Sequence, residues 1–387
     1  MKKRNYNFRQ RLFLHKQCWL NLAHVAAIVL IALLLTRFTI YNISSLSIFA
    51  PMDKEVDFQM SDFYNLVADN KVVRDFSQDV IVVGVDGCSR REVIDAINII
   101  SACGPKAIGL DMYFTFPEED NTYFLKTITE TPNLVCAEMV IQEGQSDHFT
   151  RQPLSFYQSD IHPITGYVNL NADDAQHVVR TFRPYVTSSA NDTTYSMPYM
   201  LASIANKEKA RQLMNSQQEE VIIDYISLDI DTIHAKSLDV HTKKWLKGKV
   251  VLIGDVNALS DSHLTPVSQV KPGVMIHALE LQTILSGNYI KISSVWMNWL
   301  MAVLICITYV SLLLFSKRRM IDYGSLVLRV GQFLVMFLMI YVGCIVYKYH
   351  HVYVDFAPGV LMLGLGSLAF DLWFGACALV RWIKEKF

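Results

Sequence analysis

The stretch KGKVVLIGD (247–255) decides the fold of this chain. Its uninterrupted apolar, β-branched core is typical of a strand buried on both faces of a parallel sheet. A second such run, DVIVVGVD (79–86), leads into SRREVIDAINIISACG, where apolar residues recur at helical spacing between a candidate N-cap, Ser89, and a stop at Gly104. A third run, KAIGLDMYF (106–114), follows directly. Strand, helix and strand in this order predict a parallel βαβ unit.

Further stretches extend this unit into a mostly parallel α/β domain with flanking helices. Residues 121–130 are compatible with a helix, and NLVCAEMVI (133–141) predicts another buried strand. The stretches 166–170 and 178–186 predict two strands that pair across a turn at 171–174. Three more elements are expected: a helix over 197–209 that begins near Ser196, a strand over 220–226, and an amphipathic helix, GVMIHALELQTILSG (273–287), that Gly287 closes.

Four apolar stretches frame this domain and predict membrane-spanning helices. Hydrophobic residues make up 52% of the chain and charged residues only 18%, against about 25% in soluble domains. The charge deficit is concentrated in residues 17–40, 294–316, 325–347 and 355–380. Each is long enough to cross a hydrocarbon core, which needs about 20 residues of helix. The prediction is one helix before the domain (41–293) and three after it.

Basic residues predict the orientation of these spans. Residues 1–16 carry six Lys or Arg, Lys317–Arg319 follow the second span, and residues 381–387 follow the fourth. Because loops rich in Lys and Arg stay in the cytoplasm, we expect a cytoplasmic N-terminus and C-terminal tail, with residues 41–293 outside. A cleaved signal peptide is the alternative for residues 17–40. The exit TRFTIYN has no small-x-small cleavage site, which favours a retained anchor.

Arg329 and Asp371 are charges inside the last two spans. Arg329 lies ten residues after Arg319, and Asp371 lies ten residues before Arg381, so both reach a similar depth on antiparallel helices. An isolated charge in lipid is costly, and such residues usually pair within the bundle. We therefore expect an Arg329–Asp371 ion pair. A structural staple and a signalling or proton-relay role both remain open for it.

Acidic side chains follow the predicted strands and form the candidate site. Asp86, Asp111 and Asp255 each end a strand, and Asp261 and His263 lie in the loop DVNALSDSHLTPV that follows. In open parallel sheets, ligands bind where the carboxyl ends of the strands meet their loops. These side chains could cap loops by accepting backbone N–H bonds, contact a ligand or an ion, or serve catalysis. The sequence leaves the three roles open.

Signatures of other chemistry are missing from the sequence. The net charge of −1 gives no reason to expect nucleic acid as a partner. The seven cysteines form no CxxC pair and no Cys/His cluster with zinc spacing. There is no Gly-rich phosphate loop and no motif around a nucleophile. We therefore expect no cofactor, no bound metal and no enzymatic activity.

Three blocks of the soluble segment resemble the type-two CHASE domain, a sensory module of bacterial receptors that lies outside the cytoplasm. They are VIVVGVDGCS, CGPKAIGLDMYFTFPEED, and the long stretch from KGKVVLIGD through PGVMIHALELQTILSG. The resemblance covers residues of about 55–290 at its two ends. Members of this family tend to have one helix before the domain and three after it. The resemblance thus implies a sensory domain on the outer side of a bacterial plasma (inner) membrane.

The function expected from this resemblance is a stand-alone sensor held in the lipid bilayer. The chain stops at Phe387, so the resemblance implies that an unidentified small molecule or envelope condition is read outside and passed to a separate output protein. A homo-oligomer is compatible with this prediction. The alternatives are a structural subunit of a membrane complex and, third, a metal-assisted hydrolase that uses Asp86, Asp111 and Asp255.

Overall fold

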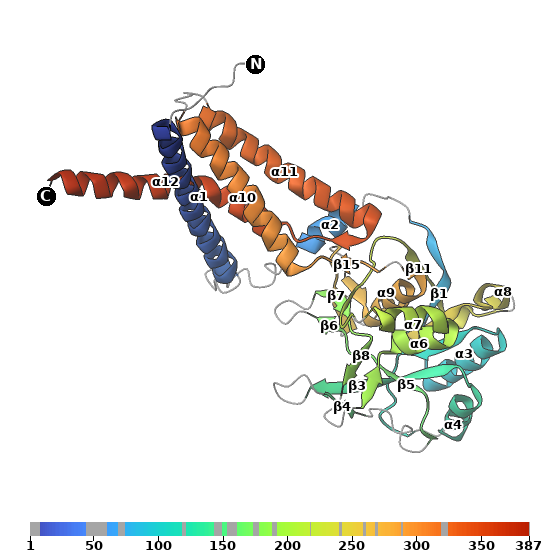
Figure 1. The fold of residues 1–387 in the computed structure, drawn as a ribbon. Coiled ribbons are helices and arrows are strands. Elements are labelled where there is room, and N and C mark those ends of the chain that lie inside the picture. The colour runs from blue at the N-terminus through green and yellow to red at the C-terminus, as the bar shows by residue number, and fades with distance from the viewer. Residues whose placement is uncertain are drawn as a thin grey trace. The chain divides into compact units, whose positions relative to one another are not determined.

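The chain divides into two units. The computed structural model describes residues 8–43, 60–68, 74–117, 121–142, 149–152, 161–172, 178–187, 192–216, 218–239, 242–257, 261–267, 270–287, 289–318 and 324–386. One unit comprises Lys54–Ile290, and the other comprises Met1–Asp53 together with Lys291–Phe387 (Figure 1). The first is the α/β domain and the second contains the four long apolar helices.

A seven-stranded sheet forms the centre of the α/β domain. Its strands lie in the order β11-β1-β12-β2-β3-β4, and β5 also pairs with β3. All these pairs are parallel except β3 with β4. The strands are β1 (Phe76–Gly84), β2 (Ala107–Leu110), β3 (Leu134–Gln142), β4 (Phe149–Gln152), β5 (Thr165–Tyr167), β11 (Asp229–His234) and β12 (Val250–Gly254). The predicted mostly parallel α/β fold is confirmed.

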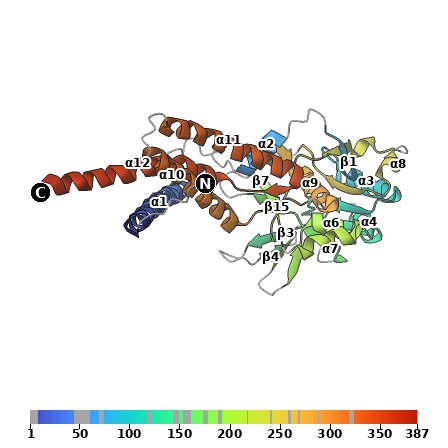
Figure 2. The same cartoon turned by 45° about the horizontal axis from the view of Figure 1, so that its top comes forward.

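Helices cover both faces of this sheet, so the domain has three layers (Figures 1 and 2). A hydrophobic core lies on each face of the sheet, and alternate residues of β1 pack into each of them. Val80 and Val82 face one core, and Ile81 and Val83 face the other. This alternation explains why residues 80–83 of the strand are apolar throughout. The first side holds α6 (Met197–Ala205), α7 (Lys207–Asn215) and α9 (Gly273–Ser286), and the second holds α3 (Arg90–Ala102), α4 (Asn121–Glu130) and α8 (Thr242–Leu246).

Local signals define the ends of the helices. Ser89 caps α3 in a capping box, because its side chain accepts from the backbone N–H of Glu92 while the Glu92 carboxylate accepts from the Ser89 N–H at 2.7 Å. Gly287 ends α9 in the left-handed region with φ 71°. Asn206 interrupts the predicted helix over 197–209. It ends α6, and its side chain then accepts from Lys209 N–H to cap α7.

Smaller sheets surround the central one. Strands β7 (Val179–Phe182), β6 (Asn171–Ala172) and β10 (Val221–Ile222) make one antiparallel sheet. Two hairpins accompany it, β8 (Tyr185–Thr187) with β9 (Thr193–Tyr195) and β13 (Ser262–Leu264) with β14 (Val270–Pro272). Helix α2 (Met60–Ala68) and the short 3₁₀ helix η2 (Ala235–Ser237) complete the described elements of this domain.

Two predictions about this middle region are wrong, and a third lies partly outside the described residues. The strand at 166–170 does not pair with 178–186; β5 instead extends the main sheet beside β3, where Gly166 lets α6 approach within 2.5 Å of the position a Cβ would occupy. The strand over 220–226 is reduced to β10, because Asp224 Oδ1 accepts from two later backbone N–H groups and turns the chain. Of the turn at 171–174, residues 173 and 174 lie outside the described residues.

The predicted helix over 273–287 is confirmed, but it is not amphipathic. Eleven residues of α9 are buried, including His277, Glu280, Gln282 and Thr283, so α9 lies inside the domain and not at its surface. Its polar side chains find partners there: Ser77 Oγ donates to Gln282 Oε1, and the backbone N–H of Asp224 donates to Thr283 Oγ1. A buried polar group needs such partners.

The second unit contains four helices that are long and apolar enough to cross a membrane. Their candidate spans are Trp19–Ile40 in α1 (Phe8–Ile43), Val295–Arg318 in α10, Leu326–His350 in α11 (Gly324–His350) and Ala357–Lys386 in α12. The prediction of four such helices is confirmed. A short pair, β15 (Lys291–Ile292) with β16 (Val352–Tyr353), ties the start of α10 to the connection between α11 and α12.

Polar contacts join these helices to one another. Arg329 Nη2 donates to Asp371 Oδ2 at 2.6 Å, which brings the two charges of the last spans together. Tyr309 of α10 donates to Gln332 of α11, whose amide donates in turn to the Leu363 carbonyl of α12 at 3.0 Å. Interhelical hydrogen bonds of this kind stabilise helix packing in lipid.

Candidate functional site

Neighbouring parallel strands bring three of the predicted acids to one edge of the sheet. β12 lies between β1 and β2, with Gly84 opposite Gly254 and Ile253 opposite Leu110. Asp86, Asp255 and Asp111 follow the carboxyl ends of these strands within two residues of each strand end. The structure thus places them along a common edge, but their side chains form two separate groups.

Asp86 and Asp255 form the first group and order a turn. Asp86 Oδ1 accepts from the backbone N–H of Val256 at 2.8 Å and of Asn257 at 2.9 Å, and Asp255 Oδ1 accepts from Asn257 N–H at 2.8 Å. Burial alone would raise the pKa of Asp86, but hydrogen bonds from the Asp255 side chain and from these N–H groups lower it. These contacts are those of a loop cap.

His234 fixes the other side of this turn. Its Nε2 lies 3.0 Å from the Asp86 carbonyl oxygen, and its Nδ1 accepts from the backbone N–H of Lys236 at 3.2 Å. Lys236 Nζ donates to the Gly87 carbonyl at 3.1 Å. The imidazole therefore ties the end of β11 to the loop after β1. Nothing in the sequence spacing of His234 indicated this contact.

Asp111 belongs to a second group that is buried more deeply. Burial raises the pKa of its carboxyl; the nearby charge of His277 lowers it, and the charges of Asp261 and Glu280 raise it further. Tyr113 lies beside this group, since Asp111, Asp261 and Glu138 add to the effect of burial in raising its pKa. Its hydroxyl is buried and has no hydrogen-bond partner among the described residues.

The buried pair of His277 and Glu280 is the centre of the second group. The two side chains lie one helical turn apart on α9, are only 3% and 2% exposed, and meet at 2.9 Å between Nδ1 and Oε2. The second ring nitrogen lies 3.2 Å from the Val168 carbonyl. Burial would lower the pKa of His277, but the negative charges of Glu280, Asp111 and Asp261 raise it to about 9.

Sequence reasoning did not select this pair. Asp111 was proposed from its place at a strand end, but His277 and Glu280 were taken as ordinary members of a predicted helix. The available signal was their spacing: two ionisable residues three positions apart within the otherwise uncharged stretch GVMIHALELQTILSG. Such a pair on an apolar helix indicates a buried ion pair.

Asp261 links the edge to the start of α9. A Cβ built on Gly273, the first residue of α9, would lie only 2.4 Å from Asp261 Oδ2. Pro272, the residue before the helix, makes no side-chain cap bond. A carboxylate at this position is stabilised by the positive end of the helix dipole. His263 contacts the same carboxylate, with Nε2 at 3.0 Å from Oδ1.

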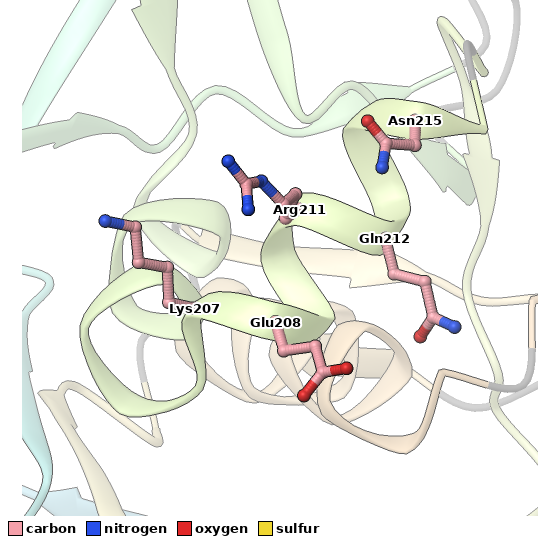
Figure 3. Close-up of a pocket in the computed structure, with 5 residues that line it drawn as sticks. All are labelled: Lys207, Glu208, Arg211, Gln212 and Asn215. Carbon is pink, nitrogen blue, oxygen red and sulfur yellow. The ribbon is translucent and has the colours of Figure 1, made fainter.

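Metal-binding geometry is not found within the described part of the chain, where no three His, Cys, Asp or Glu side chains converge on one point. A shallow hollow lies elsewhere, on α7. Figure 3 shows its lining residues, Lys207, Glu208, Arg211, Gln212 and Asn215, which all come from that one helix. Because one helix face supplies every lining side chain, we assign no site to this hollow.

Comparison with known proteins identifies the family. The family model of the CHASE2 domain matches residues 44–314, which include the whole sheet and its carboxyl edge. Curated proteins and solved structures give no match. The match confirms the resemblance carried by the three sequence blocks, and it covers more than half of the chain. The protein therefore belongs to the CHASE2 family of extracytoplasmic sensory domains and carries this domain together with four helices able to cross a membrane.

Proposed function

We propose that the protein is a membrane-anchored sensor that relays a signal from its CHASE2 domain to a separate partner protein. Family membership supports the sensory role, and the four apolar helices support the anchoring. The relay rests on one observation. Helix α9 begins at the carboxyl edge, beside Asp261, and ends at Ser286, only eight residues (287–294) before α10 begins at Val295.

The chemistry of the edge supports a stimulus with a positive charge or hydrogen-bond donors. Glu280 contacts the His277 imidazole at 2.9 Å, and the charges of Asp111 and Asp261 are near enough to raise the pKa of His277 further. A region in which charges of one sign gather attracts groups of the opposite charge. A ligand or proton that changes the charge of this group would act on α9 directly, because His277 and Glu280 are part of that helix.

The proposal assigns recognition, not catalysis, to this edge. The Asp86 carboxylate already accepts two backbone N–H bonds, so its role in the turn accounts for its position. A metal-assisted hydrolase would need divalent ions for activity. We expect the full-length protein to hydrolyse no phosphate ester above background with Mg²⁺ or Mn²⁺. If the protein shows metal-dependent turnover and Asp111→Asn abolishes it, the protein is an enzyme and the sensor proposal is wrong.

The relay also requires a defined orientation in the membrane, which we propose as bacterial plasma (inner) membrane with both termini in the cytoplasm. In a cysteine-free background, Gln78→Cys would report on the exposed start of β1 and Lys386→Cys on the end of α12. A membrane-impermeant maleimide added to intact spheroplasts should label the first and spare the second. Equal labelling of both positions would leave the signal no route across the bilayer.

A pull-down from native membranes separates the sensor from a structural subunit. The full-length chain would be isolated in mild detergent as wild type, as His277→Gln, and as Glu208→Gln, a control on the outer face of α7. If the edge controls the relay, His277→Gln should change the amount of captured partner severalfold, and the control should not. A stoichiometric partner that remains unchanged in all three preparations would favour the structural subunit.

A further inference from the structure

An elongated groove lies between two of the apolar helices, α1 and α10, which pack side by side within their unit (Figures 1 and 2). Its volume is about 540 Å³. Most of its wall is aliphatic or aromatic, with Leu22 and Val25 from α1 and Leu314 and Phe315 from α10. Both helices carry candidate membrane spans, so the groove opens toward lipid hydrocarbon.

One end of this groove is polar and positively charged. Arg318, the last residue of α10, lines it together with Asn21 and Trp19, the first residue of the candidate span in α1; Ser311 lies two turns deeper along α10. The lining contains one guanidinium and, among the described residues, no carboxylate. Trp at the end of a span marks the level of the lipid headgroups. The apolar part of the groove therefore extends from the headgroup region into the hydrocarbon.

Arg318 differs from its neighbour Lys317, which has a ring contact within the described part of the chain. Lys317 Nζ lies 3.5 Å from the centre of the Phe374 ring and is thereby directed toward α12. Arg318 is exposed and makes no hydrogen bond or ion pair with any described residue. A guanidinium at headgroup level is suited to bind a phosphate through two parallel hydrogen bonds.

We propose that this groove binds one anionic glycerophospholipid of the phosphatidylglycerol type. Its phosphate binds Arg318, its polar head reaches Asn21, and one acyl chain lies along the apolar wall between α1 and α10, past Ser311. Charge complementarity selects the lipid, since basic pockets between membrane helices are recurrent sites for anionic headgroups. The apolar length of the groove requires an acyl chain and excludes a free phosphate as the occupant.

Native mass spectrometry of the full-length protein tests the selectivity. The protein would be purified in detergent and incubated with equal amounts of phosphatidylglycerol and phosphatidylcholine. The wild type should retain one phosphatidylglycerol molecule in preference to phosphatidylcholine. Arg318→Gln should reduce this preference about fivefold, because it removes one basic contact of about 1 kcal/mol. Arg318→Lys should keep most of it. Arg381→Gln, which removes a charge on α12 outside the groove, is the matched control.

Fluorescence quenching tests the position of the acyl chain. Phosphatidylglycerol with brominated chains should quench Trp19, measured as the difference between wild type and Trp19→Phe, and glycerol phosphate should not compete. Equal retention of both lipids, or an equal loss in Arg381→Gln and Arg318→Gln, would show a general lipid shell and overturn the proposal. Absence of any Trp19 quenching would exclude a chain in this groove and favour a second helix as its occupant.

Discussion

His277 is a buried imidazole whose charge is maintained by the carboxylates around it. Its pKa is raised from 6.5 to about 9 in the folded protein, because Glu280, Asp111 and Asp261 outweigh the effect of burial. A group with a raised folded pKa stabilises the fold fully below its unfolded pKa and loses that contribution as the pH rises through the folded value. The contribution of His277 should thus decline as the pH rises from about 6.5 to about 9.

Thermal unfolding of the full-length protein in detergent between pH 6 and pH 9.5 measures this contribution. We expect the melting temperature of the wild type to fall over this range and the slope to flatten in His277→Gln. His263→Gln is the control, because that imidazole is only half-buried and contacts Asp261 from outside. If the two variants and the wild type share one slope, the charge on His277 does not stabilise the fold.

Glycine is required at position 273 because the Asp261 carboxylate approaches it closely, and not because of its backbone dihedral angles. Its missing Cβ leaves room for Asp261 Oδ2, which would otherwise lie at 2.4 Å. We expect Gly273→Ala to destabilise the domain by about 1–3 kcal/mol, the usual cost of overpacking. Made in an Asp261→Ala background, the same substitution should cost little, so a double-mutant cycle of melting curves isolates the contact. Equal costs in both backgrounds would mean that the contact with Asp261 is not what makes Gly273 necessary.

At the scale of elements, a buried ion pair attaches α2 to the antiparallel sheet of β6, β7 and β10. Asp62 of α2 meets Arg180 of β7 through two bonds of 2.8 Å, and both side chains are less than 10% exposed. Breaking a buried pair leaves one charge without compensation and typically costs about 3–5 kcal/mol. Asp62→Asn should therefore strongly destabilise the packing of α2.

The pair between Arg183 and Glu220 provides the matched control. It has the same 2.8 Å contact, but both side chains are 39% exposed. Solvent screening limits such a pair to about 1 kcal/mol or less, so Glu220→Gln should change the melting temperature little. Protease protection of α2, followed by mass spectrometry, reports on the attachment itself. Similar protection in Asp62→Asn and wild type would show that apolar packing alone holds α2.

The elements also show which kinds of structure the sequence could predict. Strands β1, β2 and β12 and helices α3 and α4 were predicted because continuous apolar runs, capping residues and glycine stops act locally. The place of β5 was not, since its partner β3 lies far away in the sequence and the register depends on how closely α6 packs on Gly166. For the site, the sequence predicted Asp86, Asp111 and Asp255 because each follows the end of a strand. Tertiary burial created the His277–Glu280 pair and sorted the acids into two groups.

At the scale of the whole molecule, the proposed relay depends on a short covalent connection. Residues 287–294 are the only link between the end of α9 and the start of α10. A short link transmits displacement, and a flexible Gly/Ser segment behaves as a random coil that absorbs it. The length and stiffness of this connection should therefore matter more for signalling than for the stability of either unit.

An insertion of eight Gly/Ser residues into 287–294 should uncouple α9 from α10. The partner captured by the full-length protein should no longer respond to His277→Gln, although the melting temperature stays close to that of the parent protein. An identical insertion between β4 and β5 lies off the path to the membrane helices and should preserve the response. A response that survives the insertion in 287–294 would mean that α9 does not carry the signal. The other covalent connection, from α1 to α2, would then be the route to examine.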